Sequence, residues 1–334
     1  MRSLYVVLGL LNLLFGGAQG QGNACLASCQ QTNGVLSLAN CGIDNADLPD
    51  LATCLNQAGR FDIIKLDLSN NALSAIGAGV FDLLENLEEL NLSNNDLTAT
   101  SLGFEVFKGL PKLLTLLLDD NSITTLGDVF DGLGDLTTLS LKRNGFASPP
   151  FGVFNVLGNL QSLLLDDNGL TTIGLSLFDG LGDLQNVSVR SNNINSFEFE
   201  AFKSLEDLQN LDLGDNGIDA LEAGDFDGLN GLITLSLDFN GIDSIQNGVF
   251  DGLNSLADLT TLDLSDNALT SLQAGVFGGL GLLTTLDLSN NDLVTLEEGT
   301  FNGLGSLALL DLRGNPDLLC VPLPTVLNLL DSSL

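Results

Sequence analysis

The feature that most constrains this chain is a phrase that recurs about every 24 residues. The segment LTTLDLSDNALTSLQAGVFGGL begins at Leu259 and LTTLDLSNNDLVTLEEGTFNGL begins at Leu283, and the two share 14 of 22 positions. An asparagine marks the same place in eleven successive copies, at positions 71, 95, 121, 144, 168, 192, 216, 240, 267, 291 and 315. A phenylalanine follows this asparagine in the first ten copies. Such self-similarity predicts an array of stacked coils, because one copy is too small to bury its apolar face alone.

Within each copy, leucines alternate with polar residues. In LTTLDLS, Leu262 and Leu264 point to one face of an extended chain and Asp263 points to the other. Parallel strands lie about 4.8 Å apart, so stacked copies would bury their leucines in one continuous core. The asparagine amide offers both donor and acceptor to neighbouring coils, and the phenylalanine fills the far side of each coil. Replacing either in mid-array should cost several kcal/mol.

The common phrase LxxLxLxxNxLxxLxxxxFxxL resembles the typical leucine-rich repeat of extracellular proteins, over about residues 35–318. Segments such as AGVFGGL and NGVFDGL are most similar to repeats of Toll-like receptor and lamprey variable lymphocyte receptor ectodomains. The resemblance implies an α/β solenoid of horseshoe shape. Its concave face would carry a parallel β-sheet, and its convex face mostly loops and short 3-10 turns. It also implies eleven repeats in residues 63–315, but it does not carry over the ligands of those receptors.

The first residues, MRSLYVVLGLLNLLFGGAQGQGN, combine one positive charge, an apolar run and a small-residue end. This pattern predicts a secretory signal in residues 1–20, and therefore a secreted, extracellular protein. No later segment offers about 18 uninterrupted apolar residues, so we predict no insertion into a membrane.

Four cysteines cluster ahead of the repeats, at Cys25, Cys29, Cys41 and Cys54. In a secreted chain they predict two disulfides in an N-terminal cap over residues 21–62. Resemblance to leucine-rich N-terminal caps implies the pairs Cys25–Cys41 and Cys29–Cys54. Cys320 lies an entire array away, beyond the reach of about 7 Å between Cα atoms that a disulfide allows. It is either a buried thiol of a monomer or a bridge between two copies, and residues 316–334 are expected to form a short C-terminal cap.

The chain has 43 acidic and 10 basic residues, a formal net charge of −33, and no His. It should repel nucleic acid and anionic membranes. Two interpretations of the acidity stay open: it keeps the protein soluble, or it attracts cations or basic partners. No dense metal motif occurs, so we expect no cofactor, with Ca²⁺ as the one alternative. Without His, no Ser–His or Cys–His pair can form, and we predict no enzymatic activity.

The outward strand positions form columns along the predicted concave face, and six residues there are candidate ligand-binding residues. Leu117 and Leu164 are apolar where most copies have Asp or Ser, and basic residues accompany them. Apolar side chains rimmed by charge are typical of docking surfaces. The candidates are Leu117, Lys142, Arg143, Leu164, Arg190 and the more isolated Phe239. The alternative is a cross-strand charge ladder, in which each exposed pair contributes about 0–1 kcal/mol.

Two glycosylation sequons, NLS at Asn91 and NVS at Asn186, should lie on the same face and flank the window between Leu117 and Leu164. These features together favour a non-catalytic recognition or adhesion module that binds a protein or glycan on its concave face. The alternative is an acidic extracellular matrix protein or a cation-binding structural protein. The variable positions show where contact can occur, but they do not identify the ligand.

Overall fold

The computed structural model describes residues 22–27, 29–57, 62–103, 105–198, 200–251 and 258–319. Two compact units divide the chain: unit 1 runs to Gly145 and unit 2 starts at Phe146. The expected signal sequence, Cys320 and most of the expected C-terminal cap lie outside the described residues.

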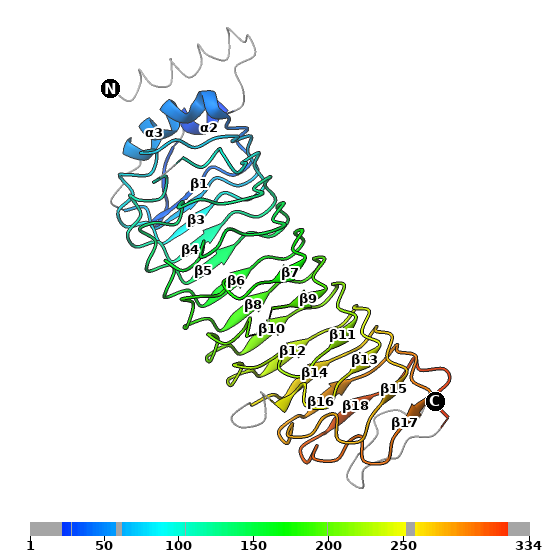
Figure 1. Cartoon of the computed structure of the whole chain (residues 1–334). Helices are drawn as coiled ribbons and strands as arrows, with labels where there is room; N and C mark the ends of the chain where they lie inside the picture. The colour runs from blue at the N-terminus through cyan, green and yellow to red at the C-terminus, as the bar shows by residue number, and fades with distance from the viewer. Residues whose placement is uncertain are drawn as a thin grey trace, which may run out of the picture. The chain divides into compact units, whose positions relative to one another are not determined.

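Unit 1 contains a parallel sheet whose strands follow chain order, one strand for each coil (Figure 1). Its three-residue strands are β1 (Val35–Ser37), β2 (Lys65–Asp67), β3 (Glu89–Asn91), β4 (Thr115–Leu117) and β5 (Thr138–Ser140). Helix α2 (Gly22–Ala27) precedes β1. The 3-10 helix η1 (Asn45–Asp47) and helix α3 (Leu48–Gln57) come between β1 and β2.

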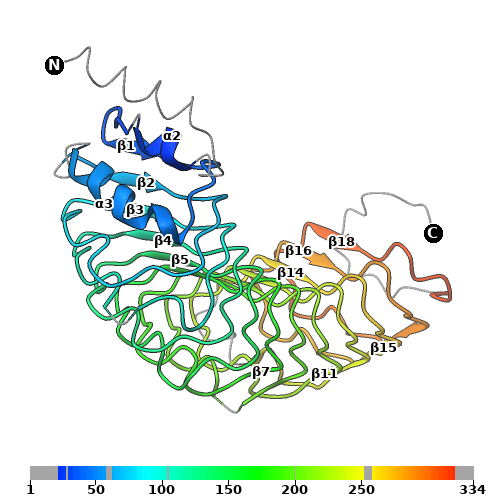
Figure 2. The same cartoon turned by 90° about the horizontal axis from the view of Figure 1, so that it is seen from above.

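Unit 2 repeats this arrangement with one long strand in each coil, again in chain order (Figure 1), and Figure 2 shows the last three of these long strands one after another. The strands are β6 (Ser162–Leu164), β8 (Asn186–Ser188), β10 (Asn210–Asp212), β12 (Thr234–Ser236), β14 (Thr261–Asp263), β16 (Thr285–Asp287) and β18 (Leu309–Asp311). Their pairing keeps the repeat register, since Leu262 of β14 pairs with Leu235 of β12 and Leu286 of β16. The parallel sheet predicted from the alternating leucines is confirmed.

On the opposite side of each coil, the chain of unit 2 runs mostly through turns, interrupted by pairs of two-residue parallel strands. These pairs are β7 (Thr172–Ile173) with β9 (Ser196–Phe197), β11 (Ala220–Leu221) with β13 (Ser244–Ile245), and β15 (Ser271–Leu272) with β17 (Thr295–Leu296). We call this side the turn side. The strand face comprises the first and third residues of each long strand and the second and third residues after it.

The asparagine column joins each coil to its neighbours through buried hydrogen bonds. Asn192 donates from Nδ2 to the carbonyl of Leu165 in the preceding coil, at 3.0 Å, and to that of Val189, at 2.8 Å. Its Oδ1 accepts from the backbone N–H of Leu170 at 3.0 Å. Equivalent bonds recur at Asn95 and Asn291. The amide therefore pairs backbone groups that the turn after each strand leaves without partners, as predicted.

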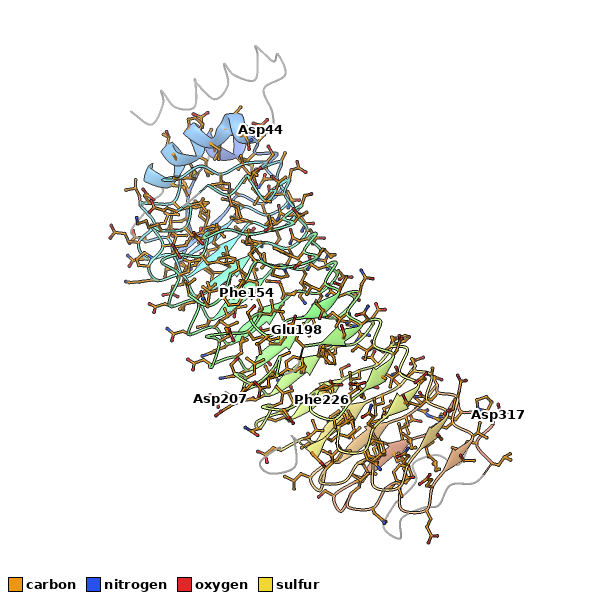
Figure 3. All side chains as sticks on the ribbon, viewed as in Figure 1. Asp44, Phe154, Glu198, Asp207, Phe226 and Asp317 are labelled. Carbon is orange, nitrogen blue, oxygen red and sulfur yellow. A yellow bond between two sulfur atoms is a disulfide. The ribbon has the colours of Figure 1, made fainter. Side chains whose placement is uncertain are left out.

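The phenylalanine column forms a stack of rings on the turn side of the core. In unit 2, Phe226 lies 6.5 Å from Phe202 and 6.1 Å from Phe250 between ring centroids, and its ring is parallel to that of Phe250 within 1°. All three are at most 1% exposed. Figure 3 labels Phe226 among the side chains of its coil. Each ring thus fills the space between coils that the leucines of the strands do not reach.

Two disulfides lie within the segment that the sequence predicts to be the N-terminal cap. Cys25 is bonded to Cys41 and Cys29 to Cys54, with Cα–Cα distances of 5.8 and 5.6 Å. This pairing matches the one implied by resemblance. The Oδ1 of Asn71 also accepts from the backbone N–H of Cys41 at 3.1 Å. The first asparagine of the array therefore continues its hydrogen-bond pattern into the cap.

Candidate functional site

In unit 1, the structure places three of the predicted ligand-binding residues on the strand face. Leu117 is the last residue of β4 and is half-buried, in register with Ser140 of β5. Lys142 and Arg143 are the second and third residues after β5. The guanidinium of Arg143 contacts the carboxylate of Asp120 in the preceding coil, with Nε–Oδ1 at 2.5 Å and Nη2–Oδ2 at 2.6 Å. This is a rung of the charge ladder that the alternative interpretation predicts.

Most acidic side chains at the strand ends have a structural use. A carboxylate or amide at the third strand position accepts a hydrogen bond from the backbone N–H two residues later. In β14, Asp263 Oδ1 accepts from Ser265 N at 2.9 Å. The same bond is made by Asp67, Asn91, Asp212, Asp287 and Asp311. This local turn explains why short acidic residues recur there.

Two coils that carry serine at the third strand position take their acceptor from the preceding coil. Asp119 Oδ1 accepts from the hydroxyl of Ser140, at 2.5 Å, and from the backbone N–H of Lys142, at 2.8 Å. Asp166 Oδ1 does the same in unit 2, accepting from the Ser188 hydroxyl and from Arg190 N.

These bonds correct one sequence prediction. The column that contains Asp119 and Lys142 was expected to lie open on the face, yet several of its members are buried. They are Ser69, Ser93, Asp166, Asp238 and Ser265, each less than 9% exposed. Asp166 accepts from the hydroxyl of Ser188 in the next coil, whereas Ser265 donates its hydroxyl to Asp263 of its own coil. The contact surface is therefore narrower than the sequence columns suggested.

In unit 2, Arg190 reaches across a whole coil. Its Nη2 lies 2.6 Å from Asp238 Oδ2 and its Nη1 lies 2.8 Å from Asp238 Oδ1, two coils along the array, while Asp212 is 3.4 Å away. The intervening residue of this column is Gly214. A Cβ there would lie only 2.0 Å from Arg190 Nη1. The absent side chain makes room for the guanidinium, a role that the sequence analysis missed.

The ion pair shifts the pKa of both partners in the directions of an attractive contact. Hydrogen bonds from Arg190 hold the pKa of the Asp238 carboxyl below its usual range, although burial alone would raise it. The same bonds raise the pKa of the Arg190 guanidinium. Because the folded pKa of Asp238 is depressed, its contribution to stability is fully present above the unfolded value of about 4. It is lost as the pH falls through the depressed value.

Substituting Gly214 with alanine is expected to displace the guanidinium and lower the free energy of unfolding by about 1–2 kcal/mol at pH 7. Urea unfolding measures this difference. The matched control is Gly217→Ala, where a Cβ would meet its nearest atom at an ordinary 3.6 Å. The gap between the two variants should shrink as the pH falls through the depressed pKa of Asp238. Equal stability of both variants at pH 7 would show that the pair does not depend on Gly214.

Phe239 is an exposed candidate and has an unusual backbone. It is 54% exposed and adopts a left-handed conformation with φ of 53°. Every coil has a left-handed residue at this position: Asn70, Asn94, Asp120, Arg143, Asp167, Ser191, Asp215, Phe239, Asp266, Asn290 and Gly314. Asn, Asp and Gly tolerate this region, whereas for other residues it costs about 1–2 kcal/mol. Phe239 is the one aromatic side chain in this column.

The remaining predicted residues also lie on the strand face. Leu164 ends β6 and is half-buried. The sequon residues Asn91 and Asn186 are half-buried in β3 and β8, and Asn186 Oδ1 accepts from Asn210 Nδ2 at 2.7 Å. Across the described ranges, no three Asp, Glu, Cys or His side chains group as a metal site. Within the same ranges, no helix is long and apolar enough to cross a membrane.

The stacked coils, asparagine ladders and ring column define a leucine-rich solenoid in each unit. The family model described as leucine rich repeat matches residues 62–97, 98–146, 158–218, 206–260 and 257–316. Because these matches span well over half of the sequence, the chain belongs to the leucine-rich repeat family.

Several solved structures are similar to the chain. It is 26% identical to a chain of the TLR13–ssRNA13 complex, covering 84% of this chain and 47% of that one, with a TM-score of 0.67. It is 28% identical to a chain of the Toll–Spatzle complex of Drosophila, covering 81% of this chain and 34% of that one, with a TM-score of 0.71. It is 27% identical to a chain of the octameric complex of Latrophilin 3, Unc5D and FLRT2, covering 78% of this chain and 76% of that one, with a TM-score of 0.65. The chain therefore spans less than half of the two receptors. These neighbours support a recognition module as its class.

Proposed function

We propose that this chain is a secreted recognition module that binds a protein through its strand face. The observation that carries the proposal is the separation of positions within each coil. Leucine, asparagine and phenylalanine columns are buried and nearly uniform, while the strand face varies and includes Leu117, Leu164 and Phe239 at sites the fold does not require to be apolar. Side chains that the core does not need are available for contact with a partner.

Two further features support this proposal. The disulfides of the cap are typical of proteins that fold in an oxidising, extracellular compartment. The similar structures include Toll in complex with Spatzle and a three-protein complex with FLRT2. One similar structure holds single-stranded RNA. A net charge of −33 disfavours that class of ligand for this chain, since phosphate binding needs basic side chains.

The cation-binding alternative receives less support from the strand face. In six coils the Oδ1 atom at the third strand position already accepts a backbone N–H. The carboxyl of Asp263 has its pKa raised chiefly by burial, with Asp287 and Asp238 acting in the same direction. These residues are used to end strands, so their density does not indicate an ion site.

The double variant Leu117→Asp/Leu164→Asp tests the proposal. Immobilised native chain is expected to retain partner proteins from the extracellular fluid of its source, and the variant should retain at least tenfold less. Such a loss corresponds to about 1.4 kcal/mol or more of binding free energy. The matched control is Leu83→Asp/Leu175→Asp, which changes two exposed leucines that lie in turns between the long strands. Equal retention by the face variant and native chain, or equal loss in both variants, would contradict binding through the strand face.

A further inference from the structure

The surroundings of Phe239 combine an exposed ring with carboxylates in both adjacent coils. The backbone N–H of Asp215 donates to the carbonyl of Asp238 at 2.8 Å, and that of Phe239 donates to the carbonyl of Ser265 at 3.1 Å. Asp215, Phe239 and Asp266 are therefore three successive rungs of one column. Neighbouring strands are about 4.8 Å apart, so both carboxylates lie within reach of one group bound over the ring.

Both carboxylates are held from the side away from the ring. Asp215 Oδ2 accepts from the hydroxyl of Ser191 in the preceding coil at 2.7 Å. Asp266 Oδ2 accepts from Nδ2 of Asn290 in the following coil at 3.3 Å. These bonds fix one negative charge on each side of Phe239, while Phe239 itself is 54% exposed.

Positive charge on this part of unit 2 is already neutralised. Three basic residues fall in the sequence of unit 2, at Arg190, Lys203 and Arg313. Each forms an ion pair with an acidic residue of its own unit: Asp238, Glu200 and Asp311, respectively. A cation brought by a partner would therefore meet an attractive field with little competing charge.

We propose that Phe239, Asp215 and Asp266 form a subsite that binds a lysine or arginine side chain of the partner protein. The cation would lie over the ring face, where the negative quadrupole attracts it, and between the two carboxylates. This inference rests on the proposed function and names the chemistry of the partner at one point of the strand face. It also gives a role to an aromatic residue in a left-handed position that asparagine would occupy with less strain.

Phe239→Asn tests the subsite because asparagine occupies the same left-handed position at Asn70, Asn94 and Asn290. The probe is a synthetic peptide with four arginines separated by glycines, titrated into the full chain by calorimetry at 0.15 M salt. Phe239→Asn should weaken binding about twofold to thirtyfold, the range of a cation–π contact. The same variant should unfold at a temperature equal to or above that of the native chain, which shows that lost binding is not lost folding.

The matched control is Phe151→Asn, which removes an 84% exposed phenylalanine from the turn side of unit 2 without changing the charge. Phe151→Asn should bind the arginine peptide as tightly as the native chain does. A peptide with citrulline in place of arginine should bind neither the native chain nor Phe151→Asn. Unchanged affinity of Phe239→Asn, or an equal loss in both variants, would overturn the subsite. If Leu117→Asp/Leu164→Asp loses its partner but Phe239→Asn binds the peptide normally, the proposed function is supported and the subsite is refuted. If Phe239→Asn binds the peptide more weakly but Leu117→Asp/Leu164→Asp keeps its partner, the subsite is supported and the proposed function is refuted.

Discussion

Replacing Phe226 with alanine is expected to lower the free energy of unfolding by about 3–5 kcal/mol, the range of large-to-small changes in a rigid core. The ring is fully buried and contacts Phe202 and Phe250 in the coils on either side, so its loss opens a cavity between three coils. The change should appear as an earlier midpoint of urea unfolding followed by circular dichroism.

Phe151→Ala provides the comparison for this variant, because it removes the same side chain from an exposed site in the same unit. It should change stability by no more than about 0.5 kcal/mol. Similar midpoints for Phe226→Ala and Phe151→Ala would mean that the ring column does not hold the coils together.

Replacing Asn192 with alanine is expected to cost about 2–4 kcal/mol through lost hydrogen bonds. The backbone N–H of Leu170 would lose its acceptor inside the core. The carbonyls of Leu165 and Val189 would each keep one hydrogen bond, because they also accept from Asn168 and Asn216 of the adjacent repeats, respectively. Urea unfolding with Asn193→Ala as control measures the effect. Asn193 is the exposed next residue, and equal stability of the two variants would refute the role given to the ladder.

The fold was predictable because the partners of each core residue are the same residue one repeat earlier and later. Reading one copy therefore supplies both neighbours of a leucine, asparagine or phenylalanine. The helices α2 and α3 lie outside that periodicity, and strands as short as Thr172–Ile173 leave no alternating pattern to recognise. For these parts the repeat gave no information about what would pack against them.

The candidate site was predicted less completely, because some of its side chains bond to an acceptor in the preceding coil or to a residue two coils away. Sequence analysis named Lys142 only as a basic candidate, whereas in the structure Asp119 accepts from the Ser140 hydroxyl and from the Lys142 backbone N–H. It also had no reason to join Arg190 to Asp238, two coils away. The sequence did contain a signal for this ion pair. Gly214 is the one glycine of its column and lies between Arg190 and Asp238 in that column.

The two ways of ending a strand have a consequence for how such an array can change in length. In the coil of Asp263, the acceptor Asp263 and the donor Ser265 belong to the same coil. Duplicating or deleting that coil as a single block would therefore not remove this acceptor from a backbone N–H of a neighbouring coil. Deleting the coil that contains Asp166 would strip Ser188 and Arg190 of their acceptor. The array therefore has junctions where insertion is tolerated and others where adjacent modules must be inherited together.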